Sequence, residues 1–212
     1  MFSFFSKTTR TKIGDTIVFG RYPQGCDERL SGIEWLVLDI KDKQALLISK
    51  QSLITSPYCR FEAGKENWSS LEWTLCYARN QLNNVFYKDA FNPKERSKIK
   101  PRTTIWSSYY HSCNDYVFLL DETECEHYFP TLESRITYPT EHCIHSGARI
   151  DMNPAGACCW WLLPFVEDHA DSLGNRAIYP KAVFQNGEIQ YHSRNVYHSD
   201  FTLRPSIIIS LD

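Results

Sequence analysis

Residues Ile33 to Ser49 read IEWLVLDIKDKQALLIS, which is two apolar runs separated by a short charged segment around Asp42. Runs of this length, rich in aliphatic and β-branched residues, are typical of strands. The segment between them has the length of a hairpin loop, so Ile33 to Ile40 and Ala45 to Ser49 are predicted to pair antiparallel. These residues predict the start of a small antiparallel sheet.

The sequence on either side of this hairpin predicts a further strand and then helices. Before it, Thr16 to Phe19 predicts a strand that leads into a turn region with Gly20, Pro23 and Gly25. After it, the apolar period becomes helical, with Ser69 or Ser70 as the expected N-cap and an inward face made of Leu71, Leu75, Ala78 and Leu82. Asn83-Asn84 is expected to weaken this helix, and Pro93 to begin another one.

The middle of the chain contains a predicted strand and a capping signal. Asp115 to Leu120 reads as a strand, and Asp121 and Glu124 fit a capping box at the start of a helix. Cys125, Tyr128 and Phe129 would then face inward, and Pro130 would end the helix.

The second half of the chain consists of short apolar runs divided by polar, turn-rich stretches. Four runs are predicted to be strands: Cys159 to Leu163, Ala177 to Phe184, Ile189 to Tyr191 and Ile207 to Leu211. A parallel β-α-β arrangement would need helices between these late strands, and none is predicted. Strands followed by helices and again by strands indicate the α+β class with a mostly antiparallel sheet and two or three short helices.

Composition sets limits on the class of protein. The chain of 212 residues shows no linker, repeat or block of like charge, so we expect a single domain over residues 1–212, with residues 1–12 peripheral or disordered. A net charge of −2 supplies no field to attract nucleic acid. No signal peptide and no membrane span is predicted. We therefore expect a soluble, cytoplasmic protein whose eight cysteines are free thiols.

Ordered segments along the chain resemble a large bacterial family with a domain of unknown function. The matching pieces are Gly14 to Gln24, Ile33 to Leu38, Ala45 to Ser49, Trp68 to Leu71, Leu82 to Tyr87 with Ala90-Phe91, Asp115 to Leu120, Trp160 to Leu162 and Leu203 to Ser206. The resemblance implies a C-type-lectin-like fold, distantly similar to formylglycine-generating enzymes and to phage tropism determinants. In that fold the chain ends lie together, and the Trp-Trp-Leu and Arg-Pro strands belong to the central sheet.

The chain departs from the family pattern at two places in the late strands. Leu163-Pro164 stands where similar proteins have Arg-Ser-Pro, and Thr202-Leu203 stands where they have Gly-Val. Both departures indicate a diverged loop face.

Two stretches, Trp106 to Ser112 and Gln190 to Phe201, have the composition of recognition loops, because they contain residues of the types Tyr, His, Ser, Asn and Arg. The same composition fits an ordinary polar loop with scattered aromatic residues, and the sequence leaves both interpretations open. The candidate ligand-binding residues are Trp106, Tyr109, Tyr110, Tyr191, His192, Arg194, Asn195, Tyr197, His198, Asp200 and Phe201.

Catalytic and metal-binding motifs are weak. Cys and His recur two residues apart near Cys113, Cys125 and Cys143, but paired knuckles with zinc spacing are missing. An oxidase similar to the formylglycine-generating enzymes would need a cysteine pair, and Cys158-Cys159 would point to opposite faces of a strand. Calcium-dependent lectin signatures, a Gly-x-Ser-x-Gly elbow and a phosphate-binding loop are also missing. We therefore expect no metal, no cofactor and no catalytic residue.

The sequence favours a non-enzymatic module that binds a protein or small ligand through loops on a lectin-like scaffold. Related lectin-like proteins include targets of diversity-generating retroelements, so a diversified receptor is a refinement of this expectation. A metal-dependent enzyme or oxidase that uses the Cys and His residues is the alternative. A structural or assembly domain is a third possibility.

Overall fold

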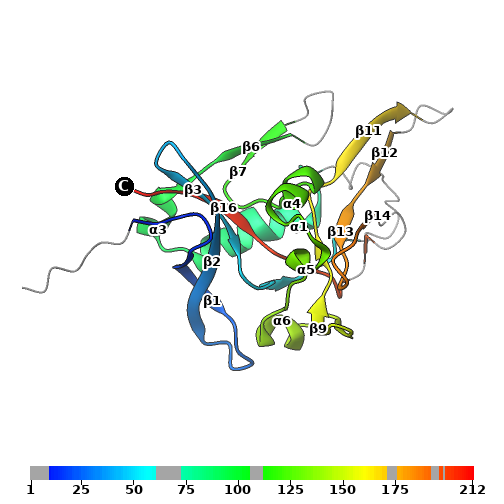
Figure 1. Cartoon of the computed structure of the whole chain (residues 1–212), viewed down its shortest axis with the longest axis horizontal. Helices are drawn as coiled ribbons and strands as arrows, with labels where there is room; N and C mark the ends of the chain where they lie inside the picture. Colours follow the sequence, from blue (N-terminus) through cyan, green and yellow to red (C-terminus); the bar gives the residue numbers. More distant parts are fainter. Residues whose placement is uncertain (1–9, 61–72, 106–111, 171–175, 192–195, 198) are drawn as a thin grey trace, which may run out of the picture.

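The structure, a computed structural model, describes residues 10–60, 73–105, 112–170, 176–191, 196–197 and 199–212 (Figure 1). In these residues the chain is a mixed α+β structure with mostly antiparallel strand pairs, which confirms the predicted class. The prediction for residues 1–12 falls mainly outside the described residues.

The first five-stranded sheet contains the hairpin predicted for residues 33–49. Its strands, in spatial order, are β1 (Thr16–Pro23), β2 (Leu30–Lys41), β3 (Gln44–Ser49), β16 (Ser206–Ser210) and β5 (Ile99–Lys100). β2 and β3 pair antiparallel from Trp35 with Ser49 to Lys41 with Gln44, as predicted. Asp42 and Lys43 both have positive φ, at 49° and 59°, which is the geometry of a tight two-residue hairpin turn.

The second five-stranded sheet is built mainly from the late part of the chain. Its order is β14 (Ile189–Tyr191), β13 (Lys181–Val183), β10 (Trp160–Trp161), β15 (Thr202–Leu203) and β4 (Ile54–Thr55). β10 and β15 run parallel, with Trp160 opposite Thr202, and the other neighbours in this sheet are antiparallel. The Trp-Trp-Leu strand and the strand before Arg204-Pro205 therefore share one sheet, as expected.

Two continuous stretches of chain join the two sheets. β3 runs on into β4 and β15 runs on into β16, and the two stretches pair with each other on both sides of the junction. At the junction the amide of Ser49 donates to the carbonyl of Pro205 at 2.9 Å. The Arg204 Nε donates to the carbonyl of Ser49, also at 2.9 Å, so this side chain forms a hydrogen bond across the junction between the two sheets.

Three two-stranded ribbons complete the β structure: β6 (Arg102–Ile105) with β7 (Ser112–Asp115), β8 (Ile150–Met152) with β9 (Ala155–Cys158), and β11 (Phe165–Ala170) with β12 (Arg176–Tyr179). The predicted strand Ala177 to Phe184 is divided at Pro180, because β12 pairs with β11 whereas β13 pairs in the second sheet. Proline has no amide hydrogen to donate to a ladder, which explains the break.

The long helix covers residues 77–90 and begins later than predicted. It consists of α1 (Tyr77–Asn80), the π-helical turn η2 (Gln81–Phe86) and α2 (Tyr87–Ala90). Cys76 is its N-cap, and the expected cap residues Ser69 and Ser70 lie outside the described residues. Ala78 and Leu82 face the core as predicted, but Leu75 is 64% exposed. The start is set by tertiary contacts, because the amide of Ala78 donates to the carbonyl of Tyr58.

Asn83 explains why Asp115 to Leu120 is not a strand. β7 ends at Asp115, and the Asn83 side chain then accepts from the amides of Tyr116 and Val117 and donates to the carbonyl of Val117 at 2.8 Å. These bonds replace part of a strand ladder, and Phe118 forms only an isolated bridge with Ser206. Asn83 also does not end the helix, because η2 carries the chain through it.

Short helices with good N-caps fill the middle of the chain. α3 (Pro93–Lys98) and α4 (Glu122–Tyr128) begin where predicted, and both have capping boxes, which for α4 is the expected pair Asp121 and Glu124. α5 (Leu132–Arg135) and α6 (Glu141–His145) were not predicted. In the part of the chain that the structure describes, every helix is too short or too polar to cross a membrane.

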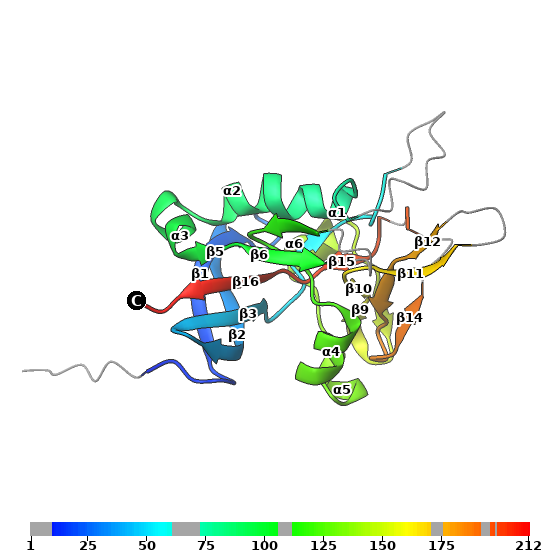
Figure 2. The same ribbon diagram turned by 90° about the horizontal axis from the view of Figure 1, so that it is seen from above.

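The buried side chains form two apolar layers, and each layer includes residues from both five-stranded sheets. The larger layer lies against the helix of residues 77–90 and includes Trp35 and Trp161. The smaller layer lies against α4 and includes Ile48 and Trp160. Figure 2 shows the helix and α4 on opposite sides of the strands. Trp160 and Trp161 are both fully buried because consecutive strand residues point to opposite faces.

We expect Asp121→Ala to lower the free energy of unfolding by about 1 kcal/mol, since Asp121 accepts from the amide of Glu124 at the start of α4. Urea denaturation of the purified chain measures the change. Glu126→Ala, an exposed position on the same helix, is the matched control and should change stability little. Equal losses in the two variants would contradict the role of the cap.

Candidate functional site

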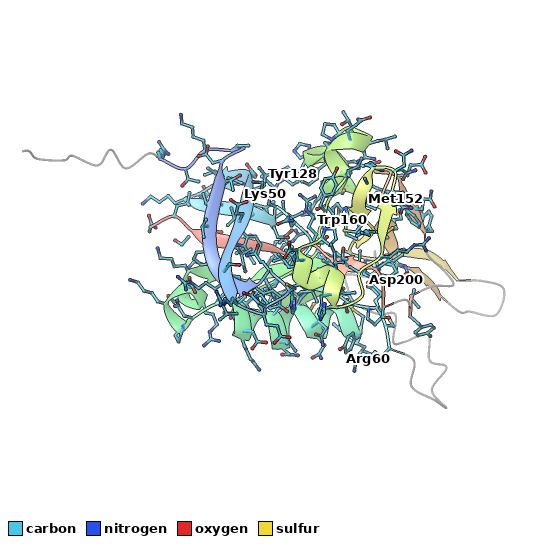
Figure 3. The ribbon with its side chains drawn as sticks, turned by 90° about the horizontal axis from the view of Figure 1, so that it is seen from below. Lys50, Arg60, Tyr128, Met152, Trp160 and Asp200 are labelled. Carbon is cyan, nitrogen blue, oxygen red and sulfur yellow. The ribbon has the colours of Figure 1, made fainter. Side chains whose placement is uncertain are left out.

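The structure describes four of the predicted ligand-binding residues, all within residues 190–201, which we call the late stretch. Tyr191 ends β14 and is 55% exposed, and Tyr197 is 45% exposed. Asp200 is half-buried, and Figure 3 places it at the end of the molecule that carries the late strands. Phe201 is 6% exposed and packs on Trp161 with 4.7 Å between ring centroids. The ring of Phe201 thus contacts the core.

The other predicted residues lie outside the described part of the chain. These are Trp106, Tyr109, Tyr110, His192, Arg194, Asn195 and His198. The strands that flank the earlier group, β6 and β7, are described, and Ile105 at the end of β6 is 53% exposed. In Figure 1 the β6–β7 and β11–β12 ribbons both project from the upper side of the molecule.

Backbone hydrogen bonds attach the late stretch to the rest of the fold. The carbonyl of Val196 accepts from the amide of Cys59 at 3.0 Å, and the carbonyl of Phe201 accepts from the amide of Ser56 at 2.9 Å. Val196 is also buried, with 3% exposure. Inward-facing Val196 and Phe201 therefore hold a segment on which Tyr197 faces solvent.

Lys181 contacts the ring of Tyr191 and was not predicted as a site residue. The two residues are direct partners across β13 and β14, and the Lys181 ammonium lies 4.3 Å from the centre of the Tyr191 ring. The Lys181 Nζ also forms an ion pair with Glu122 at the start of α4. Burial by itself lowers the pKa of Lys181, but its hydrogen bonds with Glu122 and Tyr191 raise the pKa above its ordinary value.

A sequence signal for Lys181 exists. It is a single charge inside the apolar run Ala177 to Phe184, and a lysine on the buried side of a strand requires a partner. The partner, Glu122, is far away in sequence, so its identity depends on the fold.

The Cys and His residues do not form a metal centre in the described part of the chain, which contains no group of three or more His, Cys, Asp or Glu side chains that could hold a metal ion. His111 lies outside the described residues. Cys125 and Cys143 are fully buried, and their pKa values are raised to about 12, mainly by burial. These thiols remain protonated at neutral pH and are weak nucleophiles and ligands.

Cys158 ends β9 and Cys159 lies between β9 and β10, so the two cysteines do not share one strand as predicted, but their surroundings differ. The Cys158 Sγ lies 3.6 Å from the Thr202 Oγ1 and 3.7 Å from the carbonyl oxygen of Thr137. The Cys159 Sγ donates to the Gln185 Oε1 at 2.8 Å. Burial raises the pKa of both thiols, to about 11 for Cys159. The two sulfurs thus contact separate partners.

These buried thiols predict a loss of stability at alkaline pH. The Cys143 thiol keeps its proton in the folded state up to a pKa of about 12, whereas its ordinary pKa is 9.0. The folded state therefore binds more protons than the unfolded state between these values, and the free energy of unfolding falls as pH rises from 9 towards 12.

We expect Cys143→Ala to make this alkaline loss less steep, as measured by urea denaturation at a series of pH values. Cys26→Ala is the matched control, because Cys26 is an exposed cysteine, and it should keep the wild-type slope. An unchanged slope in Cys143→Ala would contradict the assignment.

Comparison with known proteins gives one family match. A family model described as a domain of unknown function, DUF6273, matches residues 42–211, which is most of the chain. No curated protein and no solved structure shows significant similarity to the chain. The matched region includes both stretches with the composition of recognition loops and all strands from β3 onward.

Proposed function

The chain belongs to the family of the domain of unknown function DUF6273, and on that premise we propose that it is a non-enzymatic binding module. The module presents residues 165–201, together with residues 106–111, to a protein or a small-molecule ligand. Rigid aromatic side chains on a fixed scaffold bind partners at low entropic cost, and tyrosines are common in such surfaces.

One observation carries this proposal: the late stretch leaves and re-enters the same sheet through strands with buried side chains. Lys181–Val183 in β13 and Thr202–Leu203 in β15 are buried throughout, and both strands flank β10. The residues between them include Tyr191 and Tyr197, which are about half exposed. Loops held at both ends by a rigid sheet are where binding residues concentrate in proteins.

The scaffold is proposed to be C-type-lectin-like. Three features support this proposal: β1 and β16 belong to one sheet, the Trp160–Trp161 strand is central in the second sheet, and residues 165–201 follow β10 and precede β15 in the chain. A cytoplasmic location is part of the proposal as well, and the eight free cysteines support it because reducing compartments maintain thiols.

The proposal extends to a receptor diversified by a retroelement. The exposure of each side chain then predicts which positions can vary among homologous copies of the gene. Tyr191 and Tyr197 face solvent and can change, whereas Val196 and Phe201 pack in the core and should remain apolar.

The binding proposal is tested by replacing the two exposed tyrosines. The full chain is immobilised, proteins captured from the source cell are identified, and each captured protein is purified and titrated by calorimetry. We expect Tyr191→Ala and Tyr197→Ala each to weaken binding about 30-fold, because a buried tyrosine contact at an interface contributes about 2 kcal/mol.

Tyr116→Ala is the matched control, since Tyr116 is 40% exposed, stacks on Tyr87 of α2 and lies outside residues 106–111 and 165–201. It should bind like the wild type. Circular dichroism and thermal unfolding check that each variant is folded. Partners that bind the tyrosine variants and the wild type equally would contradict the proposed face.

The alternative function is a metal-dependent enzyme or oxidase that uses the Cys and His residues. Cys158 and Cys159 would be its first candidates, and their protonated, separately bonded thiols argue against it. We expect elemental analysis of the purified chain, after addition of zinc or copper and removal of excess metal, to find far less than one equivalent. One tightly held equivalent of either metal would favour the enzyme.

A further inference from the structure

A groove lies on the face of the first sheet that α4 only partly covers. Its volume is about 450 Å³, within the range of small-molecule sites. Its lining comes from the β2–β3 hairpin, β16, β6 and α4, and consists of Asp39, Lys41, Asp42, Gln44, Leu46, Arg102, Glu124 and Ile208. None of these residues belongs to residues 106–111 or 165–201, so the groove has a lining distinct from the proposed binding face.

The strand register identifies the residues that form the floor of the groove. Asp39 pairs with Leu46, and Leu46 pairs with Ile208, so these three side chains form one row across β2, β3 and β16. Directly paired residues of neighbouring strands point to the same face. Leu46 and Ile208 are half-buried and provide an apolar strip. The next row, Lys41 with Gln44, continues the same face to the hairpin turn.

Arg102 forms the opposite wall and is held in place. Its Nη1 lies 2.8 Å from the Glu124 Oε1, and its guanidinium lies 4.5 Å from the centre of the Phe118 ring. The side chain is 20% exposed. A guanidinium has five N–H donors, so one bond to Glu124 leaves donors for a ligand carboxylate. An arginine that is already oriented loses little entropy on binding.

Tyr128 is the last residue of α4 and lies beside the groove. Figure 3 shows Tyr128 between α4 and the β2–β3 hairpin. Its pKa is raised by burial first, and then by the negative charges of Asp39 on one wall and Glu124 on the other.

The charges of the groove select the class of ligand. Asp39, Lys41 and Asp42 lie at the hairpin side, where the two carboxylates outnumber the one ammonium, and Arg102 lies with Glu124 at the side of β6 and α4. A ligand with only negative charge would meet three carboxylates, counting Glu124. A ligand with only positive charge would meet Arg102 and Lys41. A molecule with an ammonium at one end, a carboxylate at the other and an apolar middle satisfies both walls and the floor.

We propose that this groove binds a small zwitterion of dipeptide size, with its carboxylate on Arg102 and its ammonium directed to Asp39 and Asp42. Leu46 and Ile208 contact the apolar middle of the ligand. The groove is thus a second binding site, and its occupation does not depend on Tyr191 or Tyr197.

The test uses leucylleucine as the probe and the full chain as the protein, with binding measured by isothermal titration calorimetry. N-acetyl-leucylleucine lacks the ammonium, and leucylleucine amide lacks the carboxylate. We expect saturable binding of leucylleucine and about 10-fold weaker binding of each blocked form, as for the loss of one charged hydrogen-bonding partner. No saturable binding of leucylleucine, or equal binding of the three compounds, would overturn the proposal.

Variants of the chain locate the ligand. Arg102→Lys keeps the charge but removes the planar fork, and Asp42→Asn keeps a residue that tolerates positive φ while it removes a carboxylate. We expect each to weaken leucylleucine binding about 10-fold. The matched controls are Lys43→Gln, in the same turn but paired with Asp212, and Tyr191→Ala at the end of the second sheet; both should bind leucylleucine like the wild type.

Methyl resonances give an independent readout if Arg102→Lys is unstable. Leucylleucine should shift the methyl signals of Leu46 and Ile208 in the wild-type chain and leave those of Val196 unchanged. Shifts centred on Val196 would place the ligand on the late stretch and would overturn the groove site.

Discussion

The pairing of residues 44–55 with residues 202–210 is the constraint on which the rest of the structure depends. It joins β3 and β4 to β16 and β15, and so it unites the two sheets. The contacts are separated by about 150 positions in sequence, so loop-closure entropy opposes them until many form together. The buried network at the junction, in which the Thr202 Oγ1 bonds to the Ser52 Oγ at 2.8 Å, helps to fix this register.

Arg204 is part of this junction, and its side chain is buried there among aromatic rings and backbone. It lies 5.0 Å from the ring of Phe129 and 5.2 Å from the ring of Trp160, and burial lowers its pKa to about 10. The Nη1 of Arg204 is buried without a hydrogen-bond partner among the described residues, which is unfavourable by itself. The two aromatic rings and the carbonyl of Ser49 offset part of that cost.

The same sheets separate the two proposed binding surfaces. One surface is at the end of the second sheet, where Tyr191 and Tyr197 face solvent above buried strands. The other lies at the hairpin end of the first sheet, where apolar residues of one face continue beyond the cover of α4. α4 contributes to both, because Glu122 pairs with Lys181 and Glu124 pairs with Arg102. One short helix therefore connects the supports of both surfaces.

Local patterns in the sequence determined the α+β class, the β2–β3 hairpin, the capping box at Asp121 and the strand Ile189–Tyr191, because alternation, turn residues and caps act within a few positions. Tertiary structure decided where the long helix begins, since the carbonyl of Tyr58 anchors it. It also decided that the Asn83 side chain takes the place of a strand partner. The Lys181–Glu122 pair and the groove at Arg102 arise from residues distant in sequence, and only the closed sheets bring them together.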